Sequence, residues 1–127
     1  MNIHELQPGF YLRVRSTGQV VALQEKTEKG LKVDCFLEPL PISRLEYLPL
    51  TPDYLGRLGF TPAGGRLMIV CGGELLYSNR LSDAGPCYVF TEWTRYDKKL
   101  RFVHQVQKAV WAASGELLTF SPLTLFL

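Results

Sequence analysis

Residues 10–37 read FYLRVRSTGQVVALQEKTEKGLKVDCFL, and this stretch decides the fold of the first part of the chain. Apolar and polar residues alternate over residues 10–15, 19–24 and 31–37, as they do in strands with one buried face. A turn at Thr17-Gly18 and a polar loop over residues 25–30 separate these three segments. The pattern predicts a three-stranded β-meander, a small curved sheet similar in shape to an SH3-like barrel. A likeness of shape alone implies no function.

A connector and a short central helix are expected next. Prolines interrupt the segment that follows the meander, so residues 40–50 should form a connector with a short strand or turn around Leu45. Thr51 can cap a helix, and Pro52 suits its first position. Gly59 is placed to end this helix after about two turns, and we expect the residue after it, Phe60, to fold back onto the helix.

The second half of the chain is expected to add more strands and a longer helix. The predicted elements are a hairpin of residues 66–71 and 74–77, a long strand over residues 87–96, a helix over residues 101–114 closed by Gly115, and a final strand over residues 117–120. The buried face of that helix is marked by apolar residues at helical spacing, namely Val103, Val106, Val110 and Ala113. The sequence therefore predicts a single α+β domain over residues 1–127, with the meander and connector in residues 1–50 and the helix, hairpin, helix and strand in residues 51–127.

Composition excludes several classes of protein. A chain of 127 residues with 46% hydrophobic and 20% charged residues is globular and needs no disulfide or metal to fold. The polar first residues and the lack of any run of eighteen apolar residues predict no secretion signal and no membrane span. The three cysteines include no Cys-x-x-Cys pair, which indicates reduced thiols in the cytoplasm.

No catalytic or metal-binding signature is recognisable. The two histidines, His4 and His104, lie a hundred residues apart without cysteine or histidine at ligand spacing, so no metal and no cofactor are expected. Cys71 could be a nucleophile if the fold brought His104 beside it, but it ends an apolar strand, where inert core cysteines usually lie. We therefore expect a protein that is not an enzyme, with a cysteine hydrolase as the alternative.

One region combines cations with aromatic rings. Residues 93–108 carry five lysines and arginines against one aspartate, whereas the rest of the chain is nearly balanced. Such a surface can stack a nucleobase and pair with its phosphates. The candidate ligand-binding residues are Trp93, Arg95, Tyr96, Lys99, Arg101, His104, Lys108 and Trp111. The competing interpretation is that residues 97–99 form a solvated turn and that the aromatic rings belong to the core.

Part of this region resembles a known group of proteins. The segment FVHQVQ at residues 102–107, followed by Gly115-Glu116-Leu117, resembles the C-terminal motif of small uncharacterised proteins encoded by phages and mobile elements of Bacteroidota. The segments PLTPDYL at residues 49–55 and LGF at residues 58–60 also resemble the central helix of that group. The opening LQPGFY at residues 6–11 is loosely similar, and Lys108 stands where the group has asparagine.

What this resemblance implies is an origin, not a mechanism. Small phage accessory proteins often counter host immunity, and some do so by sequestering the nucleotide signals of the host, typically as oligomers. The sequence fits that description in its lack of catalytic groups and in its aromatic and cationic segment, so we expect a non-enzymatic phage protein in the cytoplasm of a bacterial host, a homo-oligomer that binds and sequesters a nucleotide immune signal. The apolar tail over residues 117–127 agrees with self-association. The alternative is a protein-interaction or nucleic-acid-binding module of a phage or mobile element that uses the β-meander as its contact surface.

Overall fold

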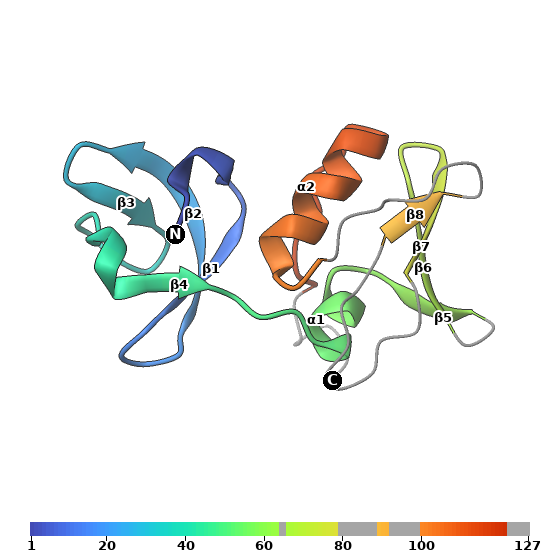
Figure 1. The fold of residues 1–127 in the computed structure, drawn as a ribbon, viewed down its shortest axis with the longest axis horizontal. Coiled ribbons are helices and arrows are strands. Elements are labelled where there is room, and N and C mark those ends of the chain that lie inside the picture. Colours follow the sequence, from blue (N-terminus) through green and yellow to red (C-terminus); the bar gives the residue numbers. More distant parts are fainter. Residues whose placement is uncertain (64–65, 79–88, 92–99, 122–127) are drawn as a thin grey trace. The chain divides into compact units, whose positions relative to one another are not determined.

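The chain folds into two compact units that both contain antiparallel strands. A computed structural model describes residues 1–63, 66–78, 89–91 and 100–121. The N-terminal unit consists of residues 1–49 and 102–104, and the C-terminal unit consists of residues 50–101 and 105–127. Two antiparallel sheets and two α-helices confirm the predicted α+β class (Figure 1).

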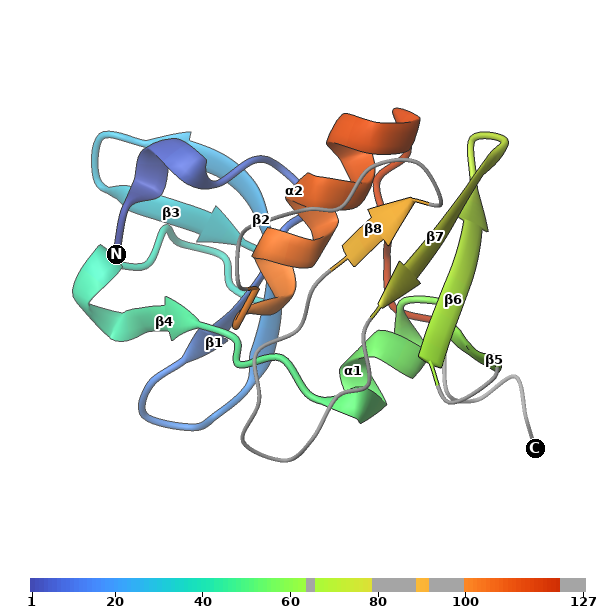
Figure 2. The ribbon, with the colours of Figure 1, turned by 45° about the vertical axis from the view of Figure 1, so that its right-hand side comes forward.

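The N-terminal unit is built on the predicted meander, with a fourth strand added. Its strands are β1 (Tyr11–Val14), β2 (Val20–Thr27), β3 (Gly30–Val33) and β4 (Leu45–Tyr47), and its two 3-10 helices are η1 (Ile3–Glu5) and η2 (Ile42–Arg44). The strands are antiparallel in the order β3-β2-β1-β4 (Figure 2). The short strand anticipated around Leu45 is therefore β4, which pairs with β1.

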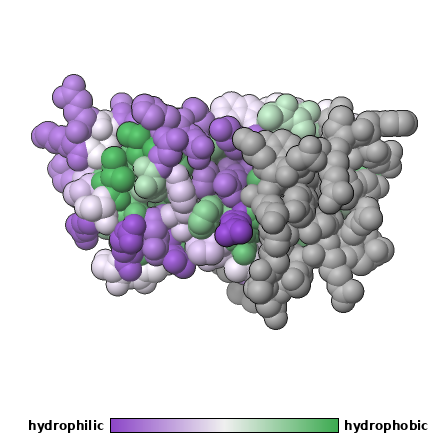
Figure 3. All heavy atoms as spheres, in the orientation of Figure 1, coloured by the Kyte–Doolittle hydropathy of each residue, from purple (hydrophilic) through white to green (hydrophobic). Residues whose placement is uncertain are grey.

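Alternation of apolar and polar residues fixes which side of this sheet is buried. Leu12 and Val14 of β1 are buried, and so are Val21 and Leu23 of β2, while Arg13 and Ala22 between them are half-buried. The resulting core consists of Leu6, Phe10, Leu12, Val14, Val21, Leu23, Leu31, Val33, Leu40 and Leu45. Figure 3 shows the opposite character at the surface, where hydrophilic residues cover most of the visible face of this unit.

Two predicted boundaries in the meander were wrong. The loop expected over residues 25–30 is shorter, because β2 continues to Thr27 before the chain turns. The third strand ends at Val33 instead of continuing to Leu37. Asp34 accepts a hydrogen bond from the Ala22 N–H at 2.7 Å, and Cys35 has a positive φ of 66°, so the chain turns away from β2 there.

The C-terminal unit contains the second sheet and most of the helical residues. Its elements are α1 (Pro52–Arg57), β5 (Thr61–Ala63), β6 (Arg66–Cys71), β7 (Glu74–Ser78), β8 (Val89–Thr91) and α2 (Val103–Ser114), of which Val103 and His104 belong to the N-terminal unit. The strands are antiparallel in the order β5-β6-β7-β8, which confirms the predicted hairpin as β6 and β7. The rest of the strand predicted over residues 87–96 lies outside the described residues.

Strand β5 was not predicted. Its central residue is Pro62, which has no N–H to donate, so the sequence does not favour a strand there. In the structure Pro62 pairs with Leu67 of β6 on the outermost described strand of the sheet, where a proline is tolerated.

The local signals of helix α1 are confirmed. The Thr51 Oγ1 accepts a hydrogen bond from the Tyr54 N–H at 3.1 Å, which caps the first turn. At the other end, the Gly59 N–H donates to the Gly56 carbonyl at 3.0 Å and the Phe60 N–H donates to the Leu55 carbonyl at 3.1 Å. Phe60 is buried, as expected of a residue that folds back.

Helix α2 follows its predicted buried face except at one end. Val103, Val106 and Val110 are fully buried, and the Gly115 N–H closes the helix on the Trp111 carbonyl at 2.8 Å. Ala113 is exposed, so its assignment to the buried face was wrong. None of the described helices is long and apolar enough to cross a membrane.

The final strand predicted over residues 117–120 was also wrong. These residues form no strand. The buried Gln107 donates its Nε2–H to the Leu118 carbonyl at 2.9 Å, and the Ser121 N–H donates to the Arg57 carbonyl at 2.7 Å. The Gln107 side chain and the last residue of α1 thus fix this segment. The alternation of apolar residues in the segment does not predict either hydrogen bond.

Gly30 provides a test of the N-terminal unit. Its φ is +144°, and a Cβ there would lie 2.2 Å from the Leu40 carbonyl oxygen, which accepts the Leu31 N–H. Gly30→Ala should lower the free energy of unfolding by at least about 2 kcal/mol, measured by urea denaturation. The control is Gly18→Ala, because Gly18 has a φ of +73° with nothing within 4 Å of the new methyl group. The control should lose about 1 kcal/mol, and equal losses would contradict the steric argument.

Candidate functional site

The structure describes four of the eight predicted ligand-binding residues. Trp93, Arg95, Tyr96 and Lys99 lie outside the described residues. The other four, Arg101, His104, Lys108 and Trp111, lie at the start of α2 or along it. They do not share one environment: three are exposed and His104 is buried.

Arg101 precedes α2 and has a fixed backbone. Its N–H donates to the Gln105 Oε1 at 2.8 Å, so that the side chain of the first helical turn reaches back over the helix start. Its carbonyl accepts the Leu50 N–H at 2.9 Å. Because both backbone groups are bonded, the exposed guanidinium extends from a defined point of the C-terminal unit.

Lys108 and Trp111 form the exposed side of α2. They are three residues apart, a spacing that places two side chains next to each other on a helix. Trp111 exposes 43% of its surface, although tryptophan is usually well buried. Val106, Gln107 and Val110, their neighbours in the helix, are fully buried. The indole ring and the ammonium group therefore lie on the opposite, exposed side of α2.

His104 lies inside the protein instead. Its side chain is 1% exposed, and its ring centroid is 4.3 Å from that of Tyr47 and 6.0 Å from that of Phe102. The neighbouring Val103 N–H donates to the Leu48 carbonyl at 2.9 Å, which holds this turn to the end of β4. His104 is therefore buried, whereas the other predicted ligand-binding residues of α2, Lys108 and Trp111, are exposed.

Cys71 has the environment of an inert thiol. It is buried, and burial raises the pKa of its thiol from 9.0 to about 11, with further contributions from a hydrogen bond to Glu116 and from the charge of that carboxylate. The Glu116 Oε1 also accepts the Gly72 N–H at 3.0 Å. A thiol nucleophile needs a lowered pKa, so this environment weighs against the cysteine-hydrolase alternative. In the described part of the chain no group of three His, Cys, Asp or Glu side chains is placed to hold a metal ion.

Sequence reasoning missed a cluster of one cation and two rings in the C-terminal unit. The Arg57 Cζ lies 4.6 Å from the centroid of Phe120 and 5.9 Å from that of Tyr54. The two rings stack, with centroids 5.4 Å apart and planes inclined by 22°. Tyr54 and Arg57 are three residues apart on α1, so that their proximity follows from the helix, but nothing in the sequence brings Phe120 to them.

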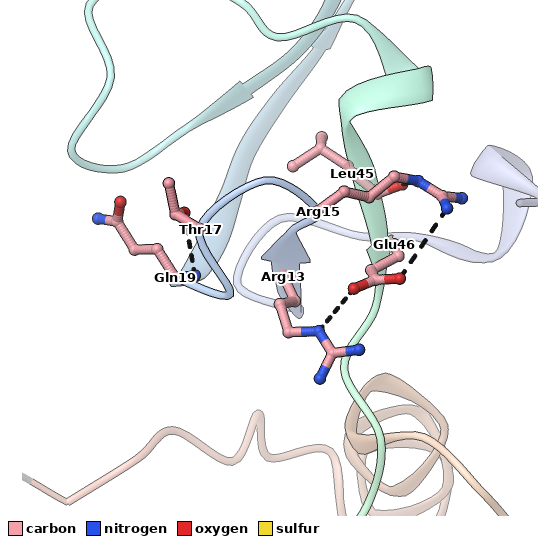
Figure 4. Close-up of polar contacts among 6 residues, drawn as sticks. All are labelled: Arg13, Arg15, Thr17, Gln19, Leu45 and Glu46. Carbon is pink, nitrogen blue, oxygen red and sulfur yellow. Dashed lines mark hydrogen bonds and ion pairs between the residues drawn. The ribbon is translucent and has the colours of Figure 1, made fainter.

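A second missed cluster lies on the outer side of the N-terminal sheet. Figure 4 shows Arg13 and Arg15 pointing to the two carboxylate oxygens of Glu46. The Arg13 Nε contacts Oε1 at 2.7 Å, while the Arg15 Nη1 is 4.0 Å from Oε2. The side chains of Arg13 and Arg15 are 35% and 59% exposed, and one carboxylate neutralises only one of the two charges.

Comparisons with protein-family models, with curated proteins and with solved structures found no significant match to this chain. The candidate sites are therefore judged on their geometry.

The Cys71 environment predicts a difference in thiol reactivity. With a pKa of about 11, only about one Cys71 thiol in a thousand is ionised at pH 8, so alkylation of the folded chain should be slow there. Glu116→Gln removes the charge but keeps an acceptor for Gly72, and should accelerate the labelling of Cys71. Mass spectrometry after timed alkylation measures both rates, with the exposed Cys35 as internal reference. Labelling of Cys71 as fast as that of Cys35 would contradict the assignment.

The same pKa predicts a loss of stability in alkali. The folded chain holds the Cys71 proton to a higher pH than the unfolded chain does. This contribution to stability is complete below pH 9.0 and declines as the pH rises toward about 11. Cys71→Ala should reduce the decline between those two values, measured by thermal unfolding at a series of pH values.

Proposed function

We propose that this chain is a non-catalytic binding protein that captures a nucleotide. The observation that carries the proposal is the exposed pair of Lys108 and Trp111 on α2. An indole ring open to solvent can stack a base, and the ammonium group one turn away can pair with a phosphate. Arg101, in the same unit, supplies a second exposed cation.

The magnitudes suit a small phosphorylated ligand. Stacking of one base on an aromatic side chain contributes about 1–3 kcal/mol, and the phosphate contacts add to it. Trp93, Arg95, Tyr96 and Lys99 stay in the proposal as further contacts, but it does not depend on them. His104 is proposed only to fix the start of α2, because its buried ring faces Tyr47.

The biological setting of the proposal comes from the resemblance to small phage and mobile-element proteins. A protein of that origin that binds a nucleotide without turning it over would act as a sponge for a host immune signal. We propose this counter-defence role, in the cytoplasm of a bacterial host and as a homo-oligomer. Binding stoichiometry and mass in solution test these parts separately from nucleotide binding itself.

The Arg13–Arg15–Glu46 cluster favours a second candidate function, a module that contacts nucleic acid through the β-meander. Arg15 is the freer cation, since it lies at 4.0 Å from a carboxylate that Arg13 contacts at 2.7 Å. Backbone and side chain both fix the position of Arg15: its N–H donates to the Arg44 carbonyl at 2.9 Å and its Nε to the Leu45 carbonyl at 3.2 Å. A positioned, half-neutralised pair of arginines on an exposed sheet suits a phosphate backbone.

Nucleotide capture predicts a ligand-dependent rise in thermal stability. A nucleotide second messenger at a hundred times its dissociation constant should stabilise the fold by about 2.7 kcal/mol. Trp111→Ala and Lys108→Gln should each weaken binding about tenfold or more, as the loss of a stacking or charged contact does. The control is Lys29→Gln, which removes the same charge from an exposed turn of the N-terminal unit. The proposal is wrong if no nucleotide shifts the melting temperature, or if Lys29→Gln matters as much as Lys108→Gln.

Nucleic-acid binding predicts a different response to salt. If Arg15 contacts a phosphate of duplex DNA, Arg15→Gln should reduce the slope of log affinity against log salt concentration by about 0.9. Glu46→Gln frees Arg13 and should strengthen binding. Fluorescence anisotropy with a labelled duplex at four salt concentrations measures both effects. Affinities that do not change in either variant would exclude this surface.

A further inference from the structure

Arg57 lies on aromatic rings, and none of the described residues places an anion beside it. The cation–π distances of 4.6 Å to Phe120 and 5.9 Å to Tyr54 place its guanidinium on an apolar, half-buried surface. Its Nε is buried and forms no hydrogen bond. A charged donor that gives up water without gaining an acceptor costs free energy, so an arginine in this position is unusual without a ligand.

Nearby backbone acceptors are already occupied. The Leu55 carbonyl accepts the N–H groups of Leu58 and Phe60, and the Gly56 carbonyl accepts that of Gly59. The Arg57 carbonyl accepts the Ser121 N–H at 2.7 Å. The end of α1 is therefore satisfied without the guanidinium, which is not needed there as a cap.

Carboxylates do not neutralise the charge either. Asp53 is the natural candidate, because it lies four residues before Arg57 on α1, a spacing that often gives an ion pair. Within the described residues, however, the only ion pairs at 4.0 Å or less are those of Glu46 in the N-terminal unit. The exposed Asp53 thus leaves the positive charge of Arg57 available.

We infer that Arg57 is a binding site for the oxyanion group, phosphate or carboxylate, of a small molecule. Within the described residues, Nη1 and Nη2 have no hydrogen bond and, unlike Nε, are not buried. These two nitrogens form an end-on fork whose spacing matches two oxygens of one phosphate or carboxylate group. The contact pairs a guanidinium charge that no described carboxylate compensates.

The two rings favour this role physically. Stacking on Phe120 holds the guanidinium plane in one orientation, so that less side-chain entropy is lost when the anion binds. The hydrogen bond between Ser121 and Arg57 fixes the segment that carries Phe120 to the end of α1. The apolar surroundings strengthen the attraction between the bound charges by excluding water. A ligand with an aromatic or other apolar group next to its oxyanion could also contact the ring edges.

This site stands independently of the proposed nucleotide capture. It uses none of Arg101, Lys108 and Trp111, and it needs only an anion. The two proposals can therefore fail separately.

The test is a titration with inorganic phosphate at constant ionic strength, with sodium chloride as the compensating salt and acetate as a second probe. Binding is followed through the side-chain Nε–H signal of Arg57 in ¹⁵N-resolved NMR and through the melting temperature. The wild-type signal should move and saturate. Arg57→Gln should abolish the saturable response, and Arg57→Lys, which keeps the charge but not the fork, should weaken it about tenfold or more. The control Lys29→Gln, at an exposed turn of the N-terminal unit, should not change it.

Several results would overturn the inference. They are a wild-type titration without saturation, an unchanged affinity in Arg57→Lys, or an equal loss in Lys29→Gln. Should Arg57→Gln not fold, the Arg57→Lys variant and the wild-type Nε–H signal decide alone. Asp53→Asn should strengthen phosphate binding, because it removes a competing negative charge.

Discussion

The structure depends on a short antiparallel bridge between Pro49 and Phe102. A proline cannot donate to a strand pair, but in this bridge its neighbours make the bonds. The Leu48 carbonyl accepts the Val103 N–H at 2.9 Å within the N-terminal unit, and the Leu50 N–H donates to the Arg101 carbonyl at 2.9 Å within the C-terminal unit. Pro49 thus occupies a position where its missing N–H costs nothing. The bridge lies directly before α2, and the bond from Val103 to Leu48 holds the first residue of that helix to the segment after β4.

Local chemistry explains how much of the fold could be predicted. The cap at Thr51, the stop at Gly59 and the alternation along β1 and β2 act over a few residues, and each gave the element it predicts. Errors arose where distant residues decide the conformation. The third strand ends early because Asp34 accepts a hydrogen bond from β2, and residues 117–120 are not a strand because Gln107 holds their backbone. Pairing over such sequence distances leaves no local signal.

In the candidate sites, too, local spacing predicts some features and distant residues decide others. The exposure of Lys108 and Trp111 agrees with their helical spacing relative to the buried valines. The burial of His104 depends on Tyr47, which lies 57 positions earlier in the chain and contributes a ring that no periodicity predicts. The stacking of Arg57 on Phe120 likewise joins two segments that are far apart in sequence. The sequence can thus predict whether a charged residue on a regular helix is exposed. It cannot predict which distant side chains lie next to that residue and determine its environment.

The discontinuity of the N-terminal unit has a consequence for synthesis on the ribosome. Its strands are complete after residue 49, but residues 102–104, which belong to the same unit, are made about fifty residues later. At typical rates of about 5–20 residues per second, the nascent meander therefore waits several seconds, with Tyr47 lacking its contacts with Phe102 and His104. The sheet can form during that interval. A domain made of one continuous segment can finish folding as soon as that segment has been synthesised, but this unit cannot, because it contains a second, later segment. Its final state is reached only after residues 102–104 have been translated.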